Sequence, residues 1–233
     1  MLKFTRFGFV VVAVALLAST SMVKAQAISE GFEDITTLAG NGWFMQNNSV
    51  PGGTTNWFQG NSAVFPAQAG TVGSYIGANY NNTTGTNTIS NWLLMPNRSL
   101  TNGDVLTFYT RTVPSPAFPD RLQVRMSLNG ASTNVGVAPT DTGDFGTLLL
   151  DINPTYTTTG YPNAWTQFSI TLSGIGASTS GRLAFRYFVE NGGPSGANSD
   201  YIGVDTVNYN PVPEPAAMAL MGIGALALIR RRR

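Results

Sequence analysis

Cysteine and histidine are both absent from this sequence of 233 residues. Without cysteine the chain has no disulfide, no thiol nucleophile and no cysteinyl metal site. Without histidine it lacks the usual near-neutral general base and the commonest metal ligand, so Ser-His-Asp catalysis, Cys-His catalysis and histidine-based zinc sites are excluded. The composition still allows carboxylate chemistry, metal binding through oxygen ligands, or a protein without catalytic activity.

Charged residues are also scarce, at 11% of the chain, against roughly 25% in an average soluble protein. Most basic residues lie at the two ends. Between residues 26 and 210 there is no lysine, and six arginines are outnumbered by eleven carboxylates, which gives a formal net charge of −5. A nucleic-acid partner requires a basic patch that neutralises phosphates, so the composition argues against nucleic acid as a partner.

The first 25 residues have the three parts of a secretory signal peptide. Lys3 and Arg6 are followed by an apolar run over residues 7–18 and then by polar residues that lead to Val23-Lys24-Ala25, which matches a signal peptidase site. The apolar run is too short for a spanning helix. We therefore expect a helical signal peptide over residues 1–25 and a mature chain that begins near Gln26.

The last residues form a second tripartite pattern. It consists of Val212, Pro213, Glu214 and Pro215, an uncharged apolar run over residues 216–229, and the cluster Arg230, Arg231, Arg232 and Arg233. This pattern, over residues 211–233, closely resembles the PEP-CTERM sorting signal of Gram-negative bacteria. The resemblance implies recognition by an exosortase, cleavage near the motif, and release or attachment in bacteria that make exopolysaccharide.

The apolar run over residues 216–229 predicts a short hydrophobic helix. It is shorter than the ~20 residues that a transmembrane helix needs, so it is marginal as a permanent anchor, and we expect transient contact with the inner membrane. The terminal arginines should stay cytoplasmic, which holds the body outside that membrane. An uncleaved membrane tail is the alternative.

Residues 26–210 predict one all-β domain, a sandwich of two antiparallel sheets. Short runs of β-type residues are separated by turn residues, without a sustained helical period, and this spacing is typical of a sandwich or barrel. The expected strands include residues 43–46, 74–78, 89–94, 105–113, 121–128, 147–152, 165–172, 182–189 and 201–209.

Details of the pattern predict how these strands are joined and oriented. Asn129-Gly130 follows an alternating run and is typical of a two-residue hairpin. The alternation over residues 183–189 predicts that Arg186 faces outward. The loops 79–87 and 191–200 are rich in Asn, Gly, Ser and Thr, and we expect them at the ends of the sandwich, where binding function usually lies.

Several elements of the body, taken in order, resemble the choice-of-anchor J domain, which is related to cleaved-adhesin and MAM-like sandwiches. They include Gly31-Phe32-Glu33, Asn41-Gly42-Trp43, and residues 91–96, 120–127 and 200–205. The resemblance implies a jelly-roll sandwich of the extracellular adhesive type, in relatives often with a structural calcium ion, and no catalytic activity.

The resemblance carries the calcium-site pattern of the family over to Glu33 and Asp205, with Asp34 and Asp144 as weaker additions. Calcium takes six to eight oxygen ligands, and the terminal strands of a jelly roll commonly lie side by side, so such an ion would join the two ends of the domain. Solvated or hydrogen-bonded carboxylates are the alternative.

Three functions remain open. The sequence predicts a non-catalytic adhesive or structural protein of the bacterial cell surface or biofilm matrix, with an exosortase and exopolysaccharide or other matrix components as partners. A carbohydrate-binding module that uses Trp57, Tyr75 and Tyr80 is the rival. A carboxylate hydrolase is disfavoured, because it needs two carboxylates that flank one groove and the acidic residues here are scattered singly apart from Glu33-Asp34.

Overall fold

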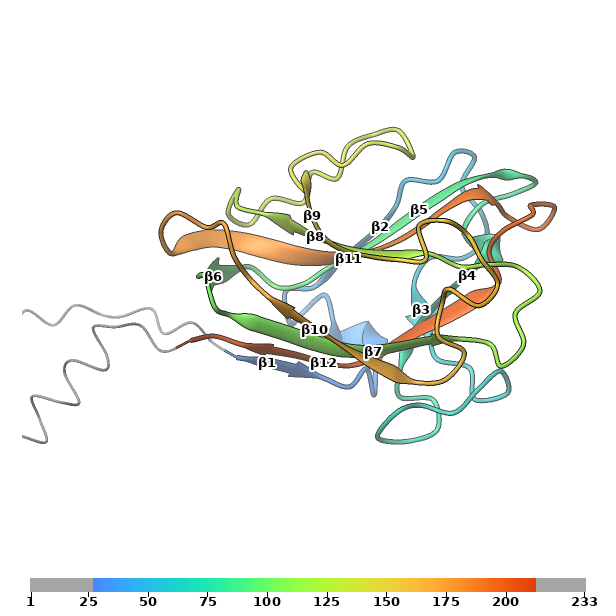
Figure 1. The fold of residues 1–233 in the computed structure, drawn as a ribbon, viewed down its shortest axis with the longest axis horizontal. Helices are drawn as coiled ribbons and strands as arrows, with labels where there is room; N and C mark the ends of the chain where they lie inside the picture. Colours follow the sequence, from blue (N-terminus) through green and yellow to red (C-terminus); the bar gives the residue numbers. More distant parts are fainter. Residues whose placement is uncertain (1–26, 213–233) are drawn as a thin grey trace, which may run out of the picture.

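The computed structural model describes residues 27–212. The expected signal peptide, the expected hydrophobic helix over residues 216–229, and the sorting residues from Pro213 onward lie outside this range. The described chain forms two antiparallel sheets that pack face to face (Figure 1). The prediction of an all-β sandwich is therefore confirmed.

One sheet has the strand order β10-β7-β12-β4-β3, with β1 also paired to β12. Its strands are β1 (Ile28–Glu30), β3 (Phe58–Gln59), β4 (Ile76–Asn79), β7 (Val105–Thr112), β10 (Thr166–Thr171) and β12 (Tyr201–Asn210). The other sheet has the order β2-β5-β11-β8-β9, with β6 also paired to β11. Its strands are β2 (Phe44–Asn47), β5 (Asn87–Leu94), β6 (Arg98–Leu100), β8 (Leu122–Ser127), β9 (Thr147–Ile152) and β11 (Thr179–Gly192). Two short 3-10 turns complete the set, η1 (Ile35–Thr37) and η2 (Tyr80–Asn82).

The connections are those of a jelly roll, as predicted. The chain changes sheets at every connection except those from β3 to β4, from β5 to β6 and from β8 to β9, and the last strand lies between β4 and β7. This arrangement joins two Greek keys into one sandwich. The expected strands agree with the observed ones to within a few residues, whereas the short β3 and β6 were not expected.

The core lies between the sheets and follows from the alternation along each strand. In β7 the side chains alternate between half-buried and buried along the whole strand, as the period of two requires. Phe108 of β7 meets Phe185 of β11 edge to face at 4.9 Å between ring centroids, which joins the two sheets directly.

A long loop over residues 128–146 covers the outer face of the second sheet and corrects two expectations. Asn129-Gly130 opens this loop instead of a tight hairpin, because β8 ends at Ser127 and the next strand begins only at Thr147. Arg186 does point away from the main core, but it is buried, because the carbonyl groups of Pro139 and Asp141 in the loop accept its hydrogen bonds.

The sandwich has two distinct ends. At the first, which we call the terminal end, β1 begins beside the last residues of β12, since Ile28 pairs with Tyr209 (Figure 1). At the opposite end, which we call the distal end, β12 begins and η2 follows β4, since Asn79 pairs with Tyr201. The prediction that the terminal strands lie side by side is confirmed.

Candidate functional site

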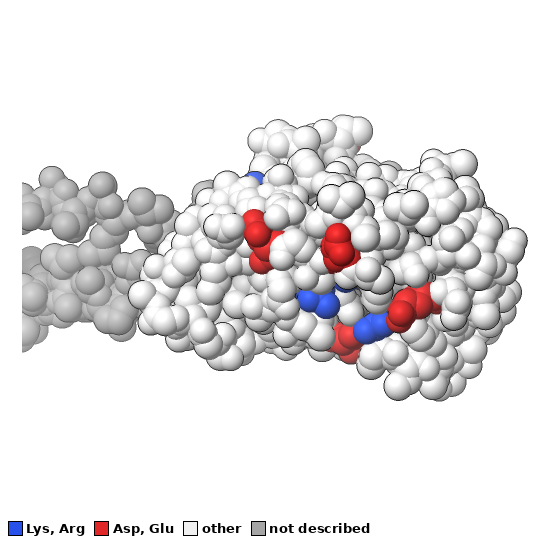
Figure 2. Space-filling model, turned by 90° about the horizontal axis from the view of Figure 1, so that it is seen from above, with Lys and Arg blue, Asp and Glu red and all other residues white. Residues whose placement is uncertain are grey.

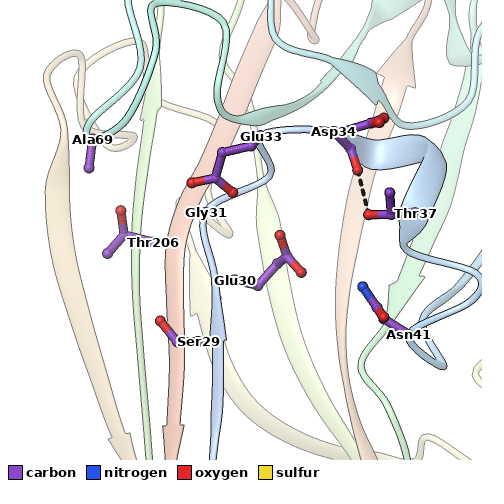
Figure 3. Close-up of a pocket in the computed structure, with 9 residues that line it drawn as sticks. All are labelled: Ser29, Glu30, Gly31, Glu33, Asp34, Thr37, Asn41, Ala69 and Thr206. Atoms are coloured by element: carbon purple, nitrogen blue, oxygen red, sulfur yellow. Dashed lines mark hydrogen bonds between the residues drawn. The ribbon is translucent and has the colours of Figure 1, made fainter.

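A pocket of about 490 Å³ lies beside β1, at the point where the chain leaves this strand (Figure 3). Its lining is almost entirely polar or small and comes from β1, the η1 turn, β12 and the segment before β4. The lining residues are Ser29, Glu30, Gly31, Glu33, Asp34, Thr37, Asn41, Ala69 and Thr206. We call it the Glu30–Glu33 pocket.

Local backbone geometry brings the two glutamates together. Phe32, between them, has a positive φ of 54°, which turns the chain sharply after β1. The backbone N–H of Phe32 donates a 2.8 Å hydrogen bond to Glu30 Oε1, and this bond holds the turn. Glu30 and Glu33 consequently both line this pocket (Figure 3). Sequence reasoning missed Glu30, because a continuous strand would have placed residues 30 and 33 on opposite faces.

Charge and burial act together on Glu30. Partial burial raises the pKa of the Glu30 carboxyl, and the neighbouring Glu33 carboxylate raises it further. Asp34 behaves differently, because its carboxylate accepts hydrogen bonds from the backbone N–H and hydroxyl of Thr36. These bonds lower the pKa of Asp34 and turn its side chain away from the two glutamates (Figure 3).

Asp205 lies in β12 at an irregularity in the pairing with β7. Its carboxylate is buried and accepts hydrogen bonds from the backbone N–H groups of Gln68, Ala69 and Thr206 at 2.8, 3.2 and 2.6 Å. Burial raises the pKa of Asp205 to about 6. The side chain therefore ties the segment before β4 to β12, with its oxygen atoms occupied by protein donors.

The predicted calcium ligands are only partly brought together. Glu33 and Asp34 line the Glu30–Glu33 pocket, whereas Asp205 is not among its lining residues, and backbone N–H groups donate hydrogen bonds to both of its oxygen atoms. Asp144 lies in the loop over residues 128–146, where Asn129 and Ser132 donate hydrogen bonds to it. Within residues 27–212 no group of three or more acidic side chains converges to hold a metal ion. The other polar side chains that line the pocket all carry oxygen atoms, which are the ligands that a hard cation such as calcium prefers.

Two of the three predicted glycan-binding aromatics are core residues, which corrects the expectation that loops would expose them. Trp57 is 4% exposed and packs in the main core. Tyr75 is fully buried, stacks on Phe65 and donates to the carbonyl of Asn61. Neither ring has a face open to a sugar, because Trp57 lies in the main core and the segment between β3 and β4 packs over Tyr75.

Tyr80, the third predicted aromatic, is 39% exposed at the distal end. Phe118, which sequence reasoning missed, is 45% exposed in the connection between β7 and β8. The backbone joins both segments to the start of β12, because the Tyr80 N–H donates to the carbonyl of Asp200 and the Ser199 N–H donates to the carbonyl of Pro119. Both exposed aromatic side chains among residues 27–212 thus lie at the distal end.

The two predicted loops meet at the same end. Thr86 Oγ1 donates to the carbonyl of Ser195 at 2.7 Å, and the Ser195 N–H donates to the carbonyl of Gly85. Loops 79–87 and 191–200 therefore form one continuous surface of amide, hydroxyl and backbone groups. Their predicted placement at an end of the sandwich is confirmed.

The face seen in Figure 2 is largely uncharged, and its basic and acidic side chains lie interspersed. The only ion pairs among the described residues involve Arg121, with Asp151 at 2.6 Å and Glu190 at 3.4 Å. Within the same range no helix is long and apolar enough to cross a membrane.

Comparisons with known proteins agree with this fold and with the C-terminal pattern. Residues 211–233 match the family model described as the PEP-CTERM protein-sorting motif. No curated protein matches the chain.

Among solved structures, the K1 cleaved adhesin domain of Lys-gingipain from Porphyromonas gingivalis W83 is similar, with a TM-score of 0.53, 19% identity, and coverage of 81% of this chain and 99% of that one. The K3 cleaved adhesin domain of the same protein has a TM-score of 0.51, 18% identity, and coverage of 79% and 98%. At these identities the likeness shows the fold alone.

The sorting motif marks the chain for export to the cell envelope or surface. The body that it carries is a jelly-roll sandwich with the fold of the cleaved adhesin domains.

Proposed function

We propose that this chain is an exported, exosortase-processed protein of the bacterial surface or biofilm matrix, and that its sandwich is a non-catalytic adhesive module. The sorting motif supports delivery to the envelope. The adhesive role rests on one observation: both exposed aromatic side chains of the described range, Tyr80 and Phe118, lie at the end opposite the sorting signal.

The placement of these aromatic side chains and the sorting signal at opposite ends suits a module that is presented from one end. β12 runs from the distal end to Asn210, and the sorting region begins at residue 211. The distal end therefore points away from the site of attachment or processing. Loops in such a position usually carry binding function, and tyrosine offers a large contact surface with a polar hydroxyl group.

A neutral polysaccharide fits the chemistry of this surface best. The loops 79–87 and 191–200 contain amides, hydroxyls and glycines, with Asp200 as their single carboxylate and without a basic side chain. A strongly anionic polymer would be repelled by the body, because the formal net charge of the body is negative. The narrower alternative, a carbohydrate-binding module for one defined glycan, is favoured by the open ring of Tyr80.

We retain a structural calcium ion as part of the proposal, with a revised ligand set. Glu30 and Glu33 would hold the ion in the Glu30–Glu33 pocket, and the hydroxyl groups of Ser29 and Thr206 also line this space. A divalent cation there would neutralise two neighbouring carboxylates and fix the start of the domain to β12. It would stabilise the fold without taking part in a reaction.

Co-sedimentation of the exported protein with the exopolysaccharide of its host tests the adhesive role. We expect saturable binding that falls roughly tenfold in Tyr80→Ala or Phe118→Ala, as for central aromatic contacts. Val137→Ala is the matched control, because Val137 is 87% exposed but lies in the loop over residues 128–146. Absence of binding by the unmodified protein, or equal losses in all three variants, would contradict the proposal.

A further inference from the structure

The folded body continues into the first residues of the sorting region, which begins at residue 211. β12 ends at Asn210, yet the backbone N–H of Val212 still donates a 2.8 Å hydrogen bond to Asp104 Oδ1. In the sequence, Pro213-Glu214-Pro215 follows Val212 directly. The Pro-Glu-Pro tripeptide thus follows, without a linker, a residue that is fixed to the sandwich.

Asp104, which holds Val212, is itself firmly placed. Its side chain is fully buried, and Oδ2 accepts hydrogen bonds from the Thr101 N–H at 2.8 Å and from the Tyr209 hydroxyl. The backbone of Asp104 is held to the end of β10, because the N–H of Leu172 donates to its carbonyl at 2.8 Å. Burial and these hydrogen bonds fix the position of the Asp104 carboxyl group, so Val212 is anchored by a preorganised acceptor.

Gly103 allows the close approach of Val212. It has a φ of +94°, which favours glycine, and a Cβ added there would lie 3.3 Å from Val212 Cγ1. The turn over residues 101–104 therefore contacts both the backbone and the side chain of Val212. These contacts come from a segment more than a hundred residues earlier in the chain, so they exist only in the folded body.

We propose that Asp104 restrains processing of the sorting signal, because it holds Val212 on the folded body and so limits the access of the exosortase to the motif. The inference rests on the proposed function, which includes this processing. An enzyme that cuts near the motif must reach the chain on both sides of the cut. On the amino-terminal side, Asn210 is paired with Val105 and Val212 is bound to Asp104. Asp104 affects access to the peptide bond and takes no part in breaking it.

A short Gly-Ser insert between Val212 and Pro213 tests the inference in the full-length chain. The insert leaves Asp104 and the sandwich unchanged and gives the motif free chain. In an exosortase-bearing host, followed by pulse-chase labelling, we expect conversion of precursor to processed protein to become several-fold faster, because the inserted residues separate the motif from the Val212 that Asp104 holds. The same insert after Gly130, a turn residue where an added Cβ meets no neighbour, is the control and should leave the rate unchanged.

Asp104→Asn provides a second, independent measurement. It keeps the size of the side chain but removes its charge, so the Val212 amide should exchange its hydrogen faster in the folded protein, and processing should accelerate in parallel. Equal processing rates for the unmodified chain and the junction insert would overturn the inference. A complete lack of processed protein from the unmodified chain would instead overturn the proposed function. If Asp104→Asn does not fold, the comparison of the two inserts alone decides.

Discussion

The hydroxyl group of Tyr187 donates a 2.6 Å hydrogen bond to the carboxylate of Asp120, and both side chains are fully buried between the sheets. Thr112 and the backbone N–H of Asp200 donate two further hydrogen bonds at 2.6 and 2.8 Å. No basic side chain is among these donors. Burial outweighs the hydrogen bonds and raises the pKa of Asp120 from 3.8 to about 6.

This shift predicts that acidification stabilises the body. Because the pKa of Asp120 is higher in the folded than in the unfolded chain, the folded state binds more protons between pH 4 and 6. The contribution of Asp120 to stability is fully present below about pH 4 and is lost as the pH rises through 6. The full shift corresponds to roughly 3 kcal/mol.

Thermal melts of the unmodified protein and of Asp120→Asn at pH 5 and pH 7.5 isolate this contribution. The unmodified protein should gain stability from this group on acidification and the variant should not. The melting temperature of the variant, relative to that of the unmodified protein, should therefore be higher at pH 7.5 than at pH 5. A difference in melting temperature that is the same at both pH values would contradict the assignment to Asp120.

The strands were predictable because their signal is local. Alternation over residues 105–112 appears in the sequence and in the structure, and the pairing of β1 with β12 follows from jelly-roll topology. The burial of Tyr75 and Arg186 was not predictable, because two long segments fold back over the outer faces of the sheets and cover them. Trp57 was not predictable for another reason, since it precedes the short β3 in a loop-like sequence and yet packs in the main core. Glu30 was missed for a related reason, since only the turn at Phe32 brings it beside Glu33.

Arg186 shows how strongly one of these segments is held. Its guanidinium group lies over the rings of Trp92 and Phe188, at 4.6 and 4.0 Å from their centroids, and donates to the carbonyls of Pro139 and Asp141 in the loop. Burial lowers its pKa to about 9, so it stays charged at neutral pH.

Arg186→Met should destabilise the protein by roughly 2–4 kcal/mol, because it leaves the buried side chains of Ser90 and Gln123 and the loop carbonyl groups without these donors. The loop over residues 128–146 should then become sensitive to protease before the rest of the body unfolds. Urea denaturation and limited proteolysis measure the two effects. Arg125→Met, which removes a partly exposed guanidinium from β8, is the comparison, and a loss as large as that of Arg186→Met would contradict a special role for the buried group.

Gly203 in β12 provides a test of the aromatic cluster on the first sheet. A Cβ added there would lie 2.8 Å from Trp165 Cη2, 2.9 Å from Tyr75 Cδ2 and 3.0 Å from Phe65 Cε2. Gly203→Ala should therefore cost roughly 1–3 kcal/mol, as overpacking usually does, with a change in tryptophan fluorescence. Gly146→Ala is the control, because a Cβ at Gly146 meets no neighbour, and equal stability of the two variants would show that the cluster adjusts freely.

Calcium should stabilise the protein if Glu30 and Glu33 share an ion. A ligand that binds only the folded state, at a hundred times its dissociation constant, adds about 2.7 kcal/mol. We therefore expect the melting temperature to rise with calcium and to fall again with chelator, and Glu33→Gln should remove the response because one of the two carboxylates is lost.

Asp205→Asn distinguishes the revised ligand set from the one that the sequence suggested. Because backbone N–H groups occupy the Asp205 oxygens, this variant should be less stable at every calcium concentration and yet keep the full calcium response. Loss of the response in Asp205→Asn would restore Asp205 as a ligand and require the segment at Gln68 to move. Identical melts of the unmodified protein with calcium and with chelator would remove the ion from the proposal, and the adhesive surface at Tyr80 and Phe118 would stand without it.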